Sequence, residues 1–545
     1  MRKVWEQYLK IATLLYLLSV LVVLPLYYGK GYDQIGYEKV WLYQKICKVA
    51  FITVLPVFFI ARIDEILLLI KARIFQKRSL QGTISPLDMW VLGYGISLLL
   101  SFLVSDYKAS VLWGYEGWGL GAAPQFMMVL SYFLVSRFLF REEEGVWTGV
   151  HKGVRIAIGI ATFLVCGIGI LNRFMIDPLG IQKELYRSDM VYWEKGNFLS
   201  TIGNINWFSG YIVVTLFVAI GVFVFVPIKD RVTMWVMAGL CFVGSWVLVV
   251  QGSNTGHMTL VSMGLLLEYD TLVRTEKKHT LEPLRKWFLL GCLVFGCMCL
   301  SYVWIHLGGA FNYKDGLLRL LVNSPFPWCG LLFFFLGLLW ITRLEKREKQ
   351  RFPEIIELVR KFVFGGAILL VLLVLILMIV KTKAPDLLPF LPTEWFVLDV
   401  AWGNNRGVTF WAALCCFDSQ DLLHKLFGLG PDGMVQYIYS STNTWIRDTV
   451  AAVQGDLLLT NAHCEVLTVL VNQGLLGAIC FVGMLIEAIK SGLSSDESYK
   501  NAIAIGLLAY GIHGIFSFST VLNLSILFLL LGLVGNQKRN PQRIP

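Results

Sequence analysis

The chain has 545 residues, of which 56% are hydrophobic and only 15% are charged, and its mean hydropathy is +0.66. About a quarter of the residues in a soluble globular domain are charged, so this composition indicates a polytopic membrane protein. The net charge of +10 does not indicate a nucleic-acid partner, because the basic residues stand in short segments between apolar runs and no nucleic-acid-binding motif is recognisable.

Fourteen apolar runs are long enough, at about 20 residues each, to cross a bilayer as helices. We therefore predict an all-α polytopic membrane protein with about 12 to 14 transmembrane helices. The first run is not followed by a small-residue cleavage site, which favours a span over a removable signal peptide. The runs cover residues 9–28, 48–70, 86–105, 122–140, 153–172, 207–227, 232–250, 254–272, 286–307, 322–342, 362–381, 465–487, 499–516 and 519–535.

The eleven cysteines, an odd number, stand mostly within these apolar runs. No two of them have the spacing of a metal-binding CxxC motif in a connecting segment. Cys415 and Cys416 are adjacent and are interpreted as small apolar residues. The sequence therefore predicts neither a disulfide framework nor a zinc site.

The strongly basic segments between the runs indicate the orientation of the chain. If the spans alternate from an inner N-terminus, residues 71–78, 273–286 and 343–351 all face the cytoplasm, and so does the tail 536–545. Basic residues accumulate on the cytoplasmic side of membrane proteins. We therefore predict that both termini lie inside and that the number of spans is even.

This orientation places two longer segments outside, residues 173–206 and 382–461. We predict a bundle of about eleven spans over 1–381 and about three further spans over 465–545. Between them, residues 382–464 are expected to form an extracytoplasmic segment with amphipathic helices and part of the active site. No soluble domain or repeat is recognisable, so any chemistry is expected on the outer face.

The larger outer segment contains a predicted helix and a predicted turn. Residues 404–417 predict an amphipathic helix in the membrane interface, which begins near Arg406 and is anchored by Trp411. Residues 427–433, FGLGPDG, predict a turn with Pro-Asp-Gly at the bend. They also match GxGxxG, but a dinucleotide site needs this motif between a strand and a helix, so we reject that alternative. The apolar face of the predicted helix comprises Phe410, Ala413, Leu414 and Phe417.

His463 stands at the start of the run 465–487 and is a candidate general base. Asn461 is a good N-cap residue, so we predict that His463 lies in the first turn of the helix, at the positive end of its dipole. This position keeps the imidazole neutral near pH 7 and favours an anion nearby. Position alone leaves an alternative open, in which His463 only packs at the headgroup level. For Arg406 the alternative is contact with a lipid phosphate.

Five sequence elements together resemble the O-antigen ligase and Wzy-type polymerase family of membrane glycosyltransferases. Residues 462–478 (AHCEVLTVLVNQGLLGA) resemble its histidine-led motif, and 404–414 (NNRGVTFWAAL) with 426–434 (LFGLGPDGM) resemble its arginine, tryptophan and Gly-x-Gly-Pro series. Residues 203–214 (GNINWFSGYIVV) are similar to its G-N-x-N element, and 249–261 (VVQGSNTGHMTLV) stand where it has a Ser-Arg-Gly-like turn. The resemblance extends over the last two-thirds of the chain.

Two positions depart from the family pattern. Asn254 replaces the arginine of the Ser-Arg-Gly-like turn, and an asparagine can donate hydrogen bonds to a diphosphate without neutralising it. Arg187, Lys195 or His257 are candidates to compensate. Cys464 replaces the asparagine that usually follows the histidine, and Glu465 or Asn461 are candidates for the lost orienting partner.

The resemblance implies an inverting glycosyl transfer in a GT-C-like bundle, on the extracytoplasmic side of the cell membrane. The donor would be a glycan on undecaprenyl diphosphate, and the acceptor a hydroxyl of a glycan, glycolipid or protein. His463 would deprotonate this hydroxyl, and Arg406 would bind the diphosphate. Asn254, Asn206 and Gly430 would complete substrate binding. No metal or other cofactor is expected, since the outer segments contain no DxD-like pair, and ligase and polymerase are equally compatible with these residues.

Other polar residues in the spans receive structural interpretations. We expect Arg62, Asp64 and Glu65 to pair near the inner headgroups, and His513 to make a structural hydrogen bond. Asn472 and Gln473 are expected to bond between helices. The aromatic, glycine-rich residues 110–126 are interpreted as an interfacial aromatic belt, with sugar binding as the alternative.

Two other functions remain open. A transporter or flippase of lipid-linked glycans would have a similar number of spans, but should show inverted repeats and broken helices with polar residues at the midplane. The polar residues singled out here gather instead at one end of the spans. A non-catalytic assembly subunit would tolerate replacement of both His463 and Arg406.

Overall fold

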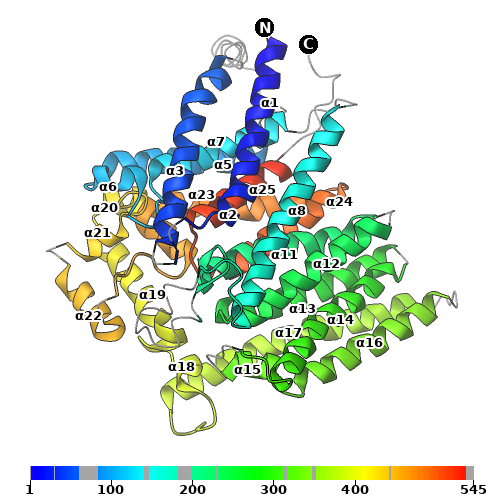
Figure 1. Cartoon of the computed structure of the whole chain (residues 1–545). Helices are drawn as coiled ribbons and strands as arrows, with labels where there is room; N and C mark the ends of the chain where they lie inside the picture. The colour runs from blue at the N-terminus through cyan, green and yellow to red at the C-terminus, as the bar shows by residue number, and fades with distance from the viewer. Residues whose placement is uncertain are drawn as a thin grey trace.

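In the computed structural model, the regular secondary structure of the described residues is helical apart from one short antiparallel hairpin (Figure 1). In this hairpin β1 (Phe198–Leu199) pairs with β2 (Gly203–Asn204), with Phe198 opposite Asn204. The structure describes residues 2–29, 31–32, 34–60, 84–139, 146–181, 196, 198–228, 231–278, 280–311, 316–346, 352–440, 443–455 and 457–535. Five predicted site or pairing residues lie outside these ranges, namely Arg62, Asp64, Glu65, Arg187 and Lys195.

The structure describes the following helices in chain order. They are α1 (Arg2–Leu18), the π-helix η1 (Ser19–Val23), α2 (Leu24–Leu26), α3 (Ile35–Thr53), α5 (Pro86–Val104), α6 (Lys108–Trp113), α7 (Ala122–Phe138), α8 (Val146–Arg173), α11 (Ile205–Phe225), α12 (Arg231–Val250), α13 (Asn254–Lys278), α14 (Glu282–His306), α15 (Gly316–Val322), α16 (Phe326–Glu345), α17 (Phe352–Lys383), α18 (Thr393–Phe396), α19 (Trp402–Ser419), α20 (Leu422–Phe427), α21 (Met434–Ile438), α22 (Thr444–Gln454), α23 (Glu465–Leu493), α24 (Ser498–Gly514) and α25 (Val521–Val534).

Within the described residues, ten helices are long and apolar enough to cross a membrane. This agrees with an all-α polytopic membrane protein. The predicted number of 12 to 14 is higher because four apolar runs lie in helices that are shorter or more polar. Three of these, α7, α24 and α25, have 17, 17 and 14 residues. The fourth, α13, carries charged residues in its second half, among them Glu268 and Asp270.

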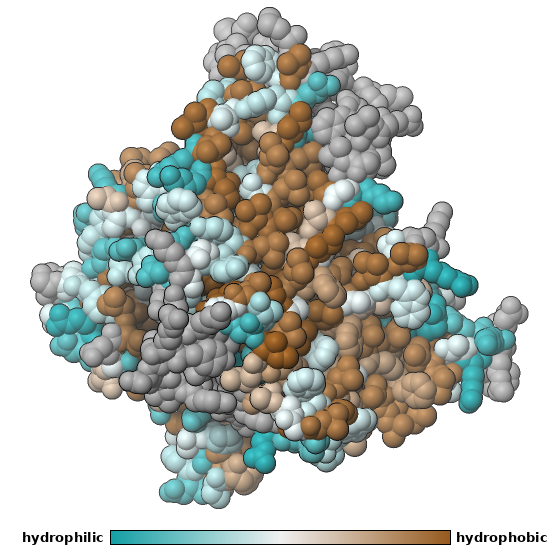
Figure 2. Space-filling model, in the orientation of Figure 1, coloured by the Kyte–Doolittle hydropathy of each residue, from teal (hydrophilic) through white to brown (hydrophobic). Residues whose placement is uncertain are grey.

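The exposed helices have surfaces that suit lipid rather than water. The stretch Ile356–Lys383 of α17 has a mean hydropathy of 3.3 in its most apolar window, and none of that window is buried inside the protein. Figure 2 shows apolar side chains across the exposed faces of α1, α3 and α8, with hydrophilic ones gathered at helix ends. Such a large apolar surface is stable only when another apolar phase covers it.

The most buried helices form the centre of the bundle. α11 packs along α24, and α23 packs against both α5 and α24. α25 packs on α7, and almost every one of its residues is buried. Because α11 and α25 are apolar on all faces, they are stable only at such a central position.

Several helix ends meet at one end of the bundle, which we call the site rim. Ser105, which follows α5, donates its hydroxyl to the carbonyl of Leu429 at 2.5 Å. Ser253, which precedes α13, donates to Asn206 at the start of α11 (2.9 Å). The backbone N–H of Ser519, between α24 and α25, donates to Glu465 at the start of α23 (2.7 Å). If the spans alternate in direction from an inner N-terminus, these helix ends and the 382–464 segment all lie on the outer side of the membrane.

α23 is interrupted where a turn of the 382–464 segment docks into it. Gly474 has φ 68° and ψ −172°, a conformation open essentially only to glycine. At this break the N–H of Leu429 donates to Val471 (3.1 Å) and the N–H of Gly430 donates to Asn472 (2.9 Å). The turn therefore replaces the hydrogen bonds that the helix loses, and it joins the segment to the bundle.

We expect Gly474→Ala to destabilise the protein markedly. The backbone conformation alone costs a non-glycine residue about 1–3 kcal/mol, and a Cβ would also overlap the backbone of Leu426. Thermal unfolding of the detergent-purified protein measures this effect. Gly511→Ala in α24 is the matched control, because a Cβ there meets no atom within 4 Å; it should change stability by less than about 1 kcal/mol. Equal melting temperatures for the two variants would contradict the docking of the turn at the break.

Candidate active site at the rim

Arg406 is placed by an unusual start of α19. Gly403, Asn404 and Asn405 all have left-handed backbone conformations, with φ of 64°, 61° and 66°. Glycine and asparagine are the residues that tolerate this region best. A Cβ at Gly407 would overlap the carbonyl of Asp399, so only glycine fits there. The NNRG sequence therefore turns the chain sharply and directs Arg406 into the bundle.

The guanidinium of Arg406 is buried among neutral groups. It donates to the carbonyl of Phe516 (2.9 Å), the carbonyl of Gly403 (2.7 Å) and the hydroxyl of Thr255 (2.8 Å). The residue is 9% exposed, and no described acidic side chain forms an ion pair with it. Burial lowers its pKa to about 10, so it remains charged at neutral pH. Three of its five N–H groups are used, which leaves two for a ligand.

His463 lies in the connection before α23, not in the first turn of the helix. Its own φ is 50°, and its backbone N–H donates to the side chain of Asn461 (3.0 Å). The N-cap residue is Cys464, without a side-chain capping bond. The prediction that Asn461 caps α23 is therefore wrong. Asn461 instead stabilises a left-handed bend, which the sequence pattern alone does not distinguish from a helix start.

The ring of His463 is neutral and available to a ligand. Burial and, to a smaller extent, the positive charge of Arg406 together lower its pKa to about 3. The ring packs edge-on against Phe518, with centroids 4.9 Å apart. Neither ring nitrogen hydrogen-bonds to another described residue. The sequence predicted a neutral ring, but through the helix dipole, whereas in the structure burial and a nearby cation produce it.

Asn206 and Asn254 come to the rim beside Arg406. The Oδ1 of Asn206 accepts the hydroxyl of Ser253 (2.9 Å), so its amide N–H groups face away from that bond. Asn254 follows Ser253 and begins α13, and the next residue, Thr255, binds Arg406. The 253–255 turn therefore connects Asn206 and Asn254 to Arg406 through the hydrogen bonds of Ser253 and Thr255.

His513 belongs to the hydrogen-bond network beneath these residues. Its Nε2 lies 2.9 Å from the hydroxyl of Ser209, which also donates to the backbone carbonyl of Asn206 (3.1 Å). This bond joins α24 to α11, as predicted for a structural histidine. His257 is also bound to the backbone, with its Nε2 2.7 Å from the carbonyl of Val249.

Gly430 is not in contact with His463 or Arg406. Its φ is 106°, and a Cβ on it would meet the side chain of Ser105 at 2.6 Å. The structure gives it a positioning function in the turn that docks at the break in α23. The predicted substrate contact of Gly430 is not visible in this arrangement.

The buried face of α19 differs from the prediction. Leu414 is 53% exposed, although it was placed on the apolar face. Trp411 packs edge-on against Trp445 of α22 at 5.7 Å, so it contacts protein and does not stand free as an anchor. Small residues on the buried face of α19 allow α22 and α23 to approach it closely. The spacing of apolar residues alone did not identify this face as the buried one. The buried side chains are Val408, Thr409, Ala412, Ala413 and Cys416.

Several residues that build the site were not singled out by the sequence pattern. Thr255, Phe516 and Phe518 contact Arg406 or His463. Only Thr255 lies within one of the five elements, 249–261, and no role was assigned to it there. Arg173 at the end of α8 was missed as well. Its guanidinium donates to the carbonyls of Gln251 and Gly196, beneath the turn that leads to Asn254. The only sign of Arg173 in the sequence is that a charged residue stands at the end of an apolar run.

No family model matches the chain, and no curated protein matches it either. The likeness to O-antigen ligases and polymerases therefore rests on the order of the motifs. Within the described residues, no three His, Cys, Asp or Glu side chains come together as a metal site requires. The chemistry available at the rim is that of a buried cation beside a neutral imidazole. Such a pair can bind an anion and accept a proton.

Proposed function

We propose that the protein is an inverting glycosyltransferase of the O-antigen ligase or polymerase type. The observation that carries this proposal is the buried guanidinium of Arg406, which has only neutral partners and lies within electrostatic range of His463. A buried charge without a counter-ion is costly, so its presence favours a site whose counter-ion is a ligand. The matching donor is a glycan on a polyprenyl (undecaprenyl) diphosphate at the outer face of the cell membrane.

The diphosphate would bind where the unused donors converge. Arg406 contributes its two free N–H groups, and its planar guanidinium suits the oxygens of a phosphate. The amide of Asn206 and the start of α13 at Asn254 contribute further donors. The polyprenyl chain would extend from this site along the apolar surface of the bundle.

The transfer itself needs one base and one anion stabiliser. His463 takes the proton of the acceptor hydroxyl, and the oxygen attacks the anomeric carbon of the donor sugar. The bond from that carbon to the diphosphate breaks on the opposite face, which inverts the configuration. Arg406 stabilises the negative charge on the departing lipid diphosphate. His463 then releases its proton to water.

Binding of the donor would also prepare the base. In the free protein burial and, to a smaller extent, the charge of Arg406 hold down the pKa of His463. A diphosphate bound to Arg406 offsets this charge, so the pKa of His463 rises toward its ordinary value. A stronger base is therefore formed only when the donor is in place.

One observation favours the alternative, a transporter or flippase of lipid-linked glycans. α23 is a broken helix with Asn472 and Gln473 buried at the break, a feature common in transporters. The carbonyls at the break, however, already accept hydrogen bonds from Leu429 and Gly430. They are used to hold the 382–464 segment and are not left for a cargo, so the transferase remains the preferred function.

Lipid-linked glycan measured separately in the two leaflets tests this proposal. We expect cells with His463→Ala to accumulate diphosphate-linked glycan on the outer leaflet and to lose the finished polymer or conjugate. His306→Ala is the matched control, because His306 stacks on Tyr302 at the exposed end of α14. Accumulation on the inner leaflet would support a flippase. No change at matched protein level would support a non-catalytic subunit and contradict the mechanism.

A further inference from the structure

A polar pocket is lined by residues next to His463 in the chain and by Phe518, which contacts its ring. Its walls include Asn461, Glu465 and Phe518, which flank the histidine, and Asp432 and Gln473 from the docked turn and α23. It encloses about 30 Å³, which is room for a water molecule or a hydroxyl group but not for a whole sugar ring. An acceptor that reaches His463 through this pocket would insert a hydroxyl and keep its ring at the entrance.

The pocket walls are rich in hydrogen-bond acceptors. Asp432 is 8% exposed and Glu465 is 6% exposed, and each carboxylate accepts from backbone N–H groups of a neighbouring segment. The amide of Gln473 donates to the hydroxyl of Tyr94 (3.0 Å), while its buried Oε1 accepts no hydrogen bond. A buried acceptor without a partner is costly. The missing partners are donors, and sugar hydroxyls supply them.

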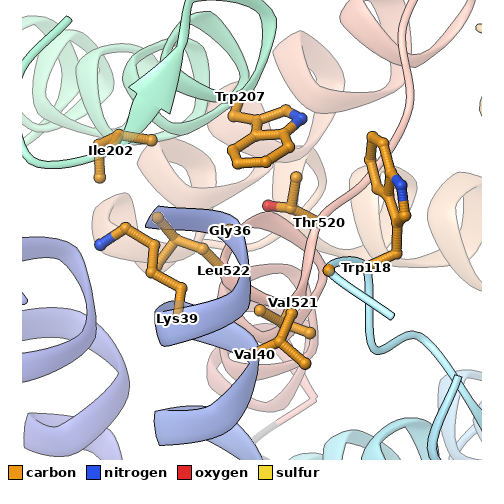
Figure 3. A pocket seen from close by; sticks show the side chains of 10 residues that line it. Gly36, Lys39, Val40, Trp118, Ile202, Trp207, Thr520, Val521 and Leu522 are labelled. Carbon is orange, nitrogen blue, oxygen red and sulfur yellow. The ribbon is translucent and has the colours of Figure 1, made fainter. Parts of the chain in front are cut away.

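Trp118 forms an aromatic wall of the same pocket. It also lines an adjoining apolar pocket with Trp207, seen in Figure 3. Its ring lies edge-on to Trp207 (5.5 Å) and to Phe518 (5.0 Å), and Phe518 in turn contacts His463. Trp118 therefore lines the pocket, as in the sugar-binding alternative for residues 110–126 and unlike an aromatic ring of an interfacial belt.

The loop that carries Trp118 is tied to the docked turn. One carboxylate oxygen of Asp432 accepts from the backbone N–H groups of Tyr115 (2.8 Å) and Leu120 (3.3 Å), on either side of the tryptophan. Gly117 and Gly119 have φ of 82° and 63°, which lets the chain bend tightly around the ring. The fold thus presents an aromatic face beside polar acceptors, the combination that carbohydrate sites use: apolar sugar faces stack on the ring, and hydroxyls reach the polar groups.

The charges of the rim are divided between two halves. Arg406 is the cation of one half, whereas two carboxylates, Asp432 and Glu465, line the other. His463 is close enough to Arg406 to feel its charge, and its ring contacts Phe518, which lines the pocket with the two carboxylates. An anionic group is attracted to the first half and repelled from the second.

We propose that the pocket lined by Trp118, Asp432, Glu465 and Gln473 is the acceptor subsite, and that it takes a neutral sugar. This inference rests on the proposed glycosyl transfer and adds the class of acceptor to it. A sugar ring packs on Trp118, and its hydroxyls donate to the carboxylates and to the Oε1 of Gln473. Sugars with a carboxylate or phosphate at the entering end are excluded by the negative half of the rim.

Saccharide binding to the purified full chain in lipid nanodiscs tests the subsite directly. Saturation-transfer NMR would compare the methyl glycosides of glucose, galactose and N-acetylglucosamine with methyl glucuronide. We expect the best neutral glycoside to bind at least about tenfold more tightly than the glucuronide, because like charges oppose each other in the pocket. Trp118→Ala should lose at least about tenfold in affinity for the neutral glycoside, and Trp118→Phe should keep part of it.

Trp445→Ala is the control for a lost tryptophan, since Trp445 is 49% exposed on α22 and lies outside the pocket. Gln473→Leu removes the unpartnered acceptor and should also weaken binding. Equal binding of glucuronide and neutral glycosides, no glycoside binding at all, or unchanged affinity in a folded Trp118→Ala protein would each overturn the subsite. Because this measurement involves no transfer, sugar binding can stand even if His463→Ala leaves lipid-linked glycan unchanged, so the two proposals fail separately.

Discussion

Arg406→Met is expected to lower glycan transfer by about 10²–10³-fold, the usual loss when one donor to a developing anion is removed. Methionine replaces the unbranched stem of arginine but carries no charge, so the diphosphate loses its cation while the start of α19 keeps most of its packing. The same substitution removes the charge that opposes protonation of His463. We therefore also expect the pKa of His463 to rise from about 3, although burial still keeps it below its ordinary value.

NMR of ¹³C-labelled histidine in the purified protein measures this second effect without any substrate. Thr255→Val is the matched variant, because it removes one acceptor of Arg406 but leaves the guanidinium charge in place. It should cost only about 2–10-fold in transfer, as expected for one hydrogen bond, and should leave the pKa of His463 low. Full transfer in a folded Arg406→Met protein, or an unchanged pKa of His463, would show that Arg406 does not act on the donor and the base.

His463 is expected to control the acid side of the pH profile of transfer. Its neutral form is the base, so transfer is present above its pKa and is lost as pH falls through it. For the free protein this pKa is about 3, which places the acid limb of kcat/KM there. The bound diphosphate raises the pKa, so the acid limb of kcat should lie at higher pH. His463→Ala should remove both limbs and lower kcat by about 10²–10⁴-fold while donor binding persists.

The Asp432→Asn variant distinguishes the loss of transfer caused by protonation of His463 from a loss caused by protonation of Asp432. Burial raises the pKa of Asp432 to about 6, so its protonation also falls on the acid side of neutrality. If His463 is the base, the acid limb of kcat remains in Asp432→Asn and disappears only with His463. A limb that follows Asp432, or identical acid limbs for kcat and kcat/KM, would contradict activation of His463 by the donor.

The sequence predicted the helices better than it predicted their local irregularities. Each of the fourteen apolar runs overlaps a helix, because hydrophobicity over about 20 residues is a local property of the chain. The break in α23 at Gly474 was missed, although the run VNQGLLGA contains a glycine after two amides. Glycine also occurs in intact membrane helices, and only the turn docked at this position explains the break.

The sequence predicted which motifs of the 382–464 segment contribute to the site, but it did not predict which residues they contact. The sequence placed Arg406 at a helix start, where it lies, and His463 in the first turn of a span, whereas it lies in the connection just before that span. It did not predict the left-handed bend at His463, which depends on a hydrogen bond from its own N–H to Asn461. It also favoured an interfacial aromatic belt over sugar binding for residues 110–126, since composition does not tell a ring at the membrane interface from one that lines a pocket.

By itself, the sequence determined that this protein is a helical, lipid-compatible bundle with its informative polar residues near the ends of helices. Composition and periodicity suffice for this, because they act on each segment separately. Only the tertiary structure decided what surrounds those residues. The partners of Arg406 include the carbonyl of Phe516, 110 residues away, and the hydroxyl of Thr255, 151 residues away. Every residue carries a carbonyl, so no sequence pattern marks the one that a buried arginine will bind.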